Sequence, residues 1–230
     1  MDELDVVLAA RRLFKSVNTT EVPVLVEKYV DSVGASLRYE STLDAGQAGY
    51  TVTVQGKSCI VVNGTDSAER QRFTVCHELG HIVLRLTTEH DKTGYSFSYT
   101  KRSKNEIFCD VFAAELLLPS SLFKPLADEI AVNFLAIDEL AAKFKASRTA
   151  TGSRFAAVNA RPCAFVLAER GIVRYASRSP SLRDAKAWIE IGIKVPLCAL
   201  AAKANDKHGE GPIEVPADEW FEGWRRGGNL

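Results

Sequence analysis

The chain has 230 residues, 46% of them apolar and 25% charged, which is the composition of a globular protein with a packed core. Its 29 basic residues equal its 29 acidic ones, so there is no overall attraction to nucleic acid or to a membrane surface. No apolar run is long enough for a membrane span, the amino terminus is acidic where a secretory signal is basic, and the five cysteines form no C-x-x-C pair. We therefore expect a cytoplasmic protein with reduced thiols and no membrane contact.

The amino-terminal part is predicted to combine helices with a small antiparallel sheet. Residues 5–33 carry a helical pattern, and Pro23 is expected in the first turn of a second helix there. Three short segments rich in β-branched or aromatic residues are predicted strands: 35–39, 50–54 and 58–62. Residues 55–57 form the expected hairpin turn between the last two strands.

Two longer helices are predicted next. Asp66 and Glu69 form a capping box for a helix that runs to about Leu86. Residues 88–102 are polar and aperiodic, which indicates a surface loop. The second helix spans residues 104–118 and ends at the proline that follows. Shorter predicted elements complete the chain: helices 121–127, 130–144 and 147–157, strands 164–168 and 172–176, and a helical stretch 181–191.

The first of the two longer helices carries the sequence HELGH at residues 77–81. His77 and His81 are then one turn and about 40° apart, so that both imidazoles can reach one ion. Glu78 projects to the same side but off their line, where its carboxylate can accept a proton from a water beside the ion. Gly80 would let another backbone or a substrate come close. The alternative is two ordinary histidines flanking a solvated glutamate, which the capped start and the apolar opposite face of the helix disfavour.

A hydrolytic zinc site needs a third protein ligand and one open position. A carboxylate on the next helix is a better candidate than His90 in the polar loop or His208 in the tail. Glu106 and Asp110 share one face of that helix, and periodicity leaves Glu106 only slightly ahead, because it also belongs to a second capping box. Two imidazoles and a carboxylate suit zinc (Zn2+) best, although manganese (Mn2+) or iron would be accepted.

Two stretches resemble the ImmA/IrrE family of metallopeptidases, namely residues 72–81 (RFTVCHELGH) and 106–119 (EIFCDVFAAELLLP). In that family the glutamate that opens the second motif is the third metal ligand. The resemblance therefore implies that His77, His81 and Glu106 hold the metal and that Glu78 is the general base and then the proton donor.

Other side chains near the motifs have weaker candidate roles. Asp110 could orient an imidazole, or it could be an ordinary carboxylate on a helix face. Tyr95 and Tyr99 in the loop between the motifs could stabilise the tetrahedral intermediate, or they could be ordinary loop aromatics. A cysteine ligand is not expected, because Cys76 adjoins His77 but points about 100° away from it.

The segment that follows residue 119 is similar to a helix-turn-helix, with Ser147 as the cap of its second helix. Between residues 143 and 161 there are five basic residues and no acidic ones: Lys143, Lys145, Arg148, Arg154 and Arg161. This pattern is typical of phosphate contacts with DNA. A helical hairpin with a solvated basic face is favoured over DNA binding, because the segment lacks a second base-reading Asn or Gln.

The sequence thus predicts an α+β chain with three regions. A zincin-like metallopeptidase domain spans residues 1–120, a helix-turn-helix-like segment 121–160, and a small α/β region 161–230. The last region loosely resembles the start of the sensor-like domain of longer family members, so we expect it to be truncated.

The sequence leaves two functions open. The resemblance implies a cytoplasmic endopeptidase whose protein substrate is a helix-turn-helix repressor, cleaved to release stress-response or mobile-element genes. The alternative is a regulator that binds DNA or a repressor without cutting it and holds a structural metal, which would need a fourth protein ligand. The oligomeric state is not predicted.

Overall fold

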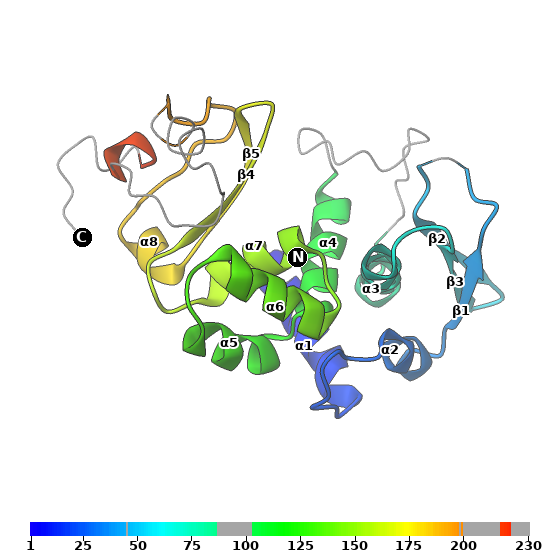
Figure 1. The fold of residues 1–230 in the computed structure, drawn as a ribbon. Helices are drawn as coiled ribbons and strands as arrows, with labels where there is room; N and C mark the ends of the chain where they lie inside the picture. The colour runs from blue at the N-terminus through cyan, green and yellow to red at the C-terminus, as the bar shows by residue number, and fades with distance from the viewer. Residues whose placement is uncertain (45, 87–102, 198, 200–216, 222–230) are drawn as a thin grey trace. The chain divides into compact units, whose positions relative to one another are not determined.

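The computed structural model describes residues 1–44, 46–86, 103–197, 199 and 217–221 (Figure 1). The chain forms two compact units. Unit 1 comprises Met1–Phe123 and Glu139–Ala150, and unit 2 comprises Lys124–Asp138 and Thr151–Leu230. Within the described part of the chain, no helix combines the length and the apolar character needed to cross a bilayer.

Unit 1 begins with helix α1 (Glu3–Ser16), which starts at a capping box between Asp2 and Asp5 and buries one apolar face. Helix α2 (Val26–Ser32) follows. Pro23 lies before this helix and not in its first turn, so that prediction was wrong. The reason is that the extended residue Leu25 is the N-cap, which moves the helix start three residues beyond the proline.

The sheet of unit 1 contains β1 (Ser36–Glu40), β2 (Gly49–Val54) and β3 (Lys57–Asn63) in the order β1-β3-β2. The hairpin between β2 and β3 is antiparallel, as predicted, but β1 pairs with β3 in parallel. The prediction of an antiparallel sheet was therefore wrong for β1. The chain passes from β1 to the outer position of β2 before β3 returns between them, which leaves β2 as an edge strand.

Helices α3 (Ala68–Leu84) and α4 (Lys104–Leu117) pack against each other and carry the two sequence motifs. The N-cap of α3 is Ser67, whose side chain accepts a hydrogen bond from Arg70 N, and not Asp66 as predicted. Asp66 instead pairs with Arg70 at 2.9 Å. Ser103 caps α4, because its hydroxyl accepts a hydrogen bond from Glu106 N, which confirms one half of the predicted capping box.

Further helices follow in the chain: α5 (Ser120–Glu129), α6 (Phe134–Phe144) and α7 (Arg148–Val158). In unit 2, β4 (Ala164–Glu169) and β5 (Ile172–Arg178) form the predicted hairpin, and short elements α8 (Pro180–Asp184) and η1 (Ala217–Glu219) come after it. The predicted helix over residues 181–191 is too long. Helix α8 ends at Asp184, because Lys186, two residues further on, has a left-handed backbone (φ 53°).

Candidate metal centre

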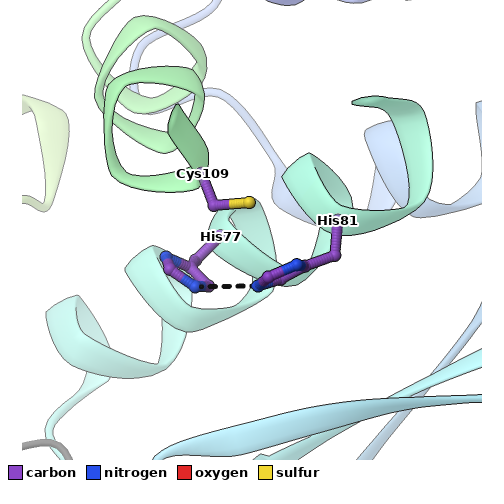
Figure 2. A group of neighbouring side chains, drawn as sticks. All are labelled: His77, His81 and Cys109. Atoms are coloured by element: carbon purple, nitrogen blue, oxygen red, sulfur yellow. Dashed lines mark hydrogen bonds between the residues drawn. The ribbon is translucent and has the colours of Figure 1, made fainter. Parts of the chain in front are cut away.

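The histidines of α3 lie side by side in the interior of unit 1. His77 is 2% exposed and His81 is 4% exposed, and their Nε2 atoms are 3.2 Å apart (Figure 2). Residues 74–81 are all buried, so the helix brings both imidazoles into the protein. The one-turn spacing predicted from the sequence is confirmed.

Two carboxylates of α4 contact the histidines, one reaching both rings and the other only His77. The Glu106 carboxylate lies 3.1 Å from His77 Nε2 through Oε2 and 3.4 Å from His81 Nε2 through Oε1. Asp110 Oδ1 accepts a hydrogen bond of 2.9 Å from the other ring nitrogen of His77, Nδ1. Glu106 therefore faces the nitrogens that converge, whereas Asp110 lies behind one ring.

The converging atoms fit the dimensions of a metal site. A tetrahedral zinc ion with bonds of about 2.0–2.1 Å holds its ligand atoms about 3.3–3.4 Å from one another. The separations among His77 Nε2, His81 Nε2 and the Glu106 carboxylate are 3.1, 3.2 and 3.4 Å. The donor set, two imidazoles and a carboxylate, is also one that zinc accepts.

The charges of the cluster are coupled. Burial disfavours the imidazolium form of His77, but the hydrogen bonds with Asp110 and Glu106 outweigh it and raise the pKa of His77 to about 9. Burial likewise disfavours the Glu106 carboxylate, and hydrogen bonds from both histidines hold its pKa well below the usual range. Without a metal, His77 would therefore carry a proton at neutral pH, which an ion must displace.

Glu78 is fully buried beside the histidines. Its Oε2 accepts a hydrogen bond of 2.8 Å from the hydroxyl of Thr51 on β2. Sequence reasoning missed Thr51, because 27 residues separate the two side chains and no spacing rule connects a strand residue to a helix that follows it.

One cysteine, Cys109, lies close to the two histidines. The ligand atoms of His77, His81 and Cys109 lie within 4.8 Å of one another (Figure 2). The expectation that no cysteine is well placed was wrong, because it considered Cys76 on α3 and overlooked Cys109, which is one turn from Glu106 on α4.

Cys109 also contacts the backbone of α3. A Cβ atom added to Gly80 would come 3.1 Å from Cys109 Cα and 3.2 Å from its Sγ. Gly80 therefore permits a close approach of the two helices, as predicted. The Cys109 thiol is fully buried, and burial raises its pKa far above the usual value. These features are those of a packed thiol, and Glu106 is the better third donor on distance and charge.

Other predicted site residues either follow α4 in the chain or lie outside the described residues. Tyr95 and Tyr99 lie outside the described residues. Lys143, Lys145 and Arg148 are exposed, while Arg154 is half-buried. Arg161 is half-buried, and its guanidinium donates to the carbonyls of Ala127 and Ile130.

Comparison with known proteins shows the family to which the chain belongs. Residues 30–156 match the family model of the IrrE N-terminal-like domain, peptidase family M78. The chain therefore belongs to the ImmA/IrrE family and carries a domain of the metallopeptidase type.

Among individual proteins, the chain is similar to the radiation response metalloprotease IrrE of Deinococcus radiodurans, with 31% identity over 93 residues. That match covers 38% of this chain and 27% of the relative. A solved structure of a Mycobacterium tuberculosis transcriptional regulator has the same fold over 75% of this chain and 55% of its own, with a TM-score of 0.54 and 15% identity.

Proposed function

We propose that this protein is a zinc-dependent endopeptidase of the cytoplasm that hydrolyses a specific peptide bond in a helix-turn-helix transcriptional repressor. Cleavage would derepress stress-response or mobile-element genes. The observation that carries the proposal is the convergence of His77, His81 and Glu106 at the separations of a metal site, with the carboxylate of Glu78 buried beside them.

In this proposal His77, His81 and Glu106 hold the zinc ion, with manganese or iron as substitutes. When bound, the ion would polarise the scissile carbonyl and lower the pKa of water. Asp110 accepts a hydrogen bond from His77 Nδ1, which orients the ring so that its Nε2 faces His81 Nε2 and the Glu106 carboxylate. Asp110 is thus a positioning residue.

Glu78 would act as the general base. Its carboxylate accepts the proton of the attacking water and then donates it to the leaving amine of the cleaved bond.

The choice of substrate rests on the comparisons and on the family resemblance. The similar metalloprotease is named for a radiation response, and the structural neighbour is named a transcriptional regulator. A peptidase whose substrate is a repressor would account for both descriptions, because cleavage of the repressor under stress allows transcription of the genes that it silences.

The test is incubation of the purified, zinc-loaded chain with the repressor encoded beside its gene, with and without a chelator. We expect one cleavage site and complete inhibition by the chelator. Glu78→Gln should lower the cleavage rate about 10²–10⁴-fold while zinc stays bound. Glu69→Gln in the first turn of α3 is the matched control and should cleave normally. Absence of cleavage by the wild type, or an active Glu78→Gln variant, would overturn the proposal.

A second candidate function follows from the position of Cys109. If its thiolate completed the coordination, the site would be closed and structural, and the protein would be a non-proteolytic regulator that binds DNA or the repressor. Cys109→Ala would then lose the metal, whereas the endopeptidase proposal expects it to remain bound.

We also propose that residues 121–160 form a helix-turn-helix-like segment and that residues 161–230 are part of a sensor-like region, after a peptidase domain over residues 1–120. In support, three residues separate α6 from α7, and the Ser147 hydroxyl accepts a hydrogen bond from Ala150 N, as a helix cap does. A gel shift with operator DNA tests whether this segment binds DNA. Binding through Lys143, Lys145, Arg148 and Arg154 predicts a salt-sensitive complex. The favoured alternative, a helical hairpin with a solvated basic face, predicts no complex.

A further inference from the structure

We infer that Thr51 is a positioning residue that holds the carboxylate of Glu78 in its working orientation. This inference rests on the proposed function, because it assigns Glu78 the role of general base. It concerns a residue that lies outside both sequence motifs, on the edge strand β2.

The packing of β2 on α3 brings Thr51 to Glu78. A Cβ atom on Gly49 would come 2.6 Å from the Thr74 methyl group, so the strand lies directly against the helix at that point. Thr51 is two residues further along β2, and Glu78 is one turn further along α3. Two strand residues advance about 6.6 Å and four helix residues about 6 Å. The two elements advance by similar distances, so Thr51 lies opposite Glu78 as Gly49 lies opposite Thr74.

The contact itself is a hydrogen bond in which the neutral Thr51 hydroxyl donates to Glu78 Oε2 at 2.8 Å. The last torsion of a glutamate side chain is broad, so helix geometry alone does not orient the carboxylate plane. A bond to one oxygen sets that plane and directs the second oxygen. A lysine or arginine in the same place would neutralise the base, whereas a hydroxyl orients it and leaves its charge available.

Thr53 is a matched control within the same strand. It lies two residues further along β2 on the same face, but its hydroxyl bonds with Ser58 Oγ at 3.0 Å and not with a residue of the site. Removing either threonine hydroxyl takes the same atom from the same strand. A general effect on β2 would therefore appear in both variants, and an effect on Glu78 only in one.

The kinetic test compares Thr51→Val, Thr51→Ser and Thr53→Val in zinc-loaded protein with the repressor as substrate. Misplacement of a catalytic group by about 1 Å costs on the order of 10²-fold in rate, so we expect Thr51→Val to lower kcat by about that factor with little change in KM. Thr51→Ser should restore most of the rate, and Thr53→Val should match the wild type. Equal losses in Thr51→Val and Thr53→Val, or no loss in Thr51→Val, would overturn the inference.

A second measurement does not depend on cleavage. Crystal structures of the zinc-loaded wild type, Thr51→Val and Thr51→Ser should show the Glu78 carboxylate turned away only in Thr51→Val, with one zinc ion per chain in all three. Thr51→Ala provides a second variant without the hydroxyl if the valine side chain disturbs the strand. An unchanged Glu78 in the hydroxyl-free variants would contradict the role of Thr51, even if the wild type proved to cleave nothing and the proposed function failed.

Discussion

Two clusters of polar side chains in this protein differ in what they bond. In the candidate metal centre of unit 1, His77, His81, Glu106 and Asp110 bond to one another, at 2.9–3.4 Å. In unit 2, Asn159 and Arg161 donate to the backbone carbonyl of Ala127, and Asp128 accepts from Ala160 N. The first cluster brings side chains together, and the second joins separate stretches of backbone.

This difference distinguishes a candidate metal-binding site from a set of hydrogen bonds that stabilises the fold. Buried backbone groups need partners, and side chains such as Asn159 provide them where the chain is irregular. Two imidazole nitrogens that face each other satisfy no backbone group, and placing them together with a carboxylate in the interior costs desolvation energy. Such an arrangement is expected where a ligand compensates that cost. The following predictions run from the largest expected effect on metal binding to the smallest.

Loss of a donor should have the largest effect. We expect His81→Ala and Glu106→Ala each to abolish stoichiometric zinc binding, because each removes one of the three proposed protein donors. Equilibrium dialysis followed by metal analysis measures this directly. Cys109→Ala serves as the control and should retain one zinc ion per chain. Retention of zinc by Glu106→Ala together with its loss in Cys109→Ala would exchange the roles of these two residues.

Loss of the residue behind the ring should have an intermediate effect. Asp110→Asn keeps the size of the side chain but removes the charge that orients His77, and such changes lower metal affinity about 10–100-fold. Competition with a chromophoric chelator gives the affinity. If Asp110→Asn abolished binding as completely as Glu106→Ala, Asp110 would be a ligand and not a positioning residue.

Most residues of the candidate metal centre could be predicted from the sequence. The spacing of His77 and His81 is a property of the helix alone, so it could be read without a structure. Periodicity alone could not separate Glu106 from Asp110, because both lie on the same face of α4. Their difference depends on how α4 packs on α3, which Gly80 and Cys109 determine through a contact between distant residues.

The errors in the fold have similar causes. The parallel pairing of β1 with β3 depends on which strand takes the sheet edge, and Thr51 meets Glu78 only because β2 takes it. Local patterns of apolar residues do not encode this order. The end of α8 depends on the left-handed backbone of Lys186, for which a lysine gives no sequence indication.

Proton competition should produce a smaller, graded effect. Because the pKa of His77 is raised to about 9, zinc must displace one proton at neutral pH, and the apparent affinity should rise about tenfold per pH unit until pH 9. A histidine with an ordinary pKa would stop contributing above about pH 6.5. Titrations between pH 7 and 8.5 decide the matter. A flat affinity over that range would show that Asp110 and Glu106 do not stabilise the imidazolium of His77.

The structural cluster should not affect the metal at all. Asn159→Ala leaves the Ala127 carbonyl and the Arg161 backbone without this partner, so we expect a loss of about 1–3 kcal/mol in the free energy of unfolding. Denaturant unfolding of the metal-free protein measures this loss. Zinc affinity should stay at the wild-type value. A large drop in affinity would mean that the distinction between the two clusters does not hold.

The most direct test of the metal site is X-ray absorption at the zinc edge of the loaded wild-type protein. An open site made by His77, His81 and Glu106 predicts only nitrogen and oxygen neighbours, at about 2.0–2.2 Å. A sulfur neighbour at about 2.3 Å would place Cys109 on the ion and contradict the open, hydrolytic site.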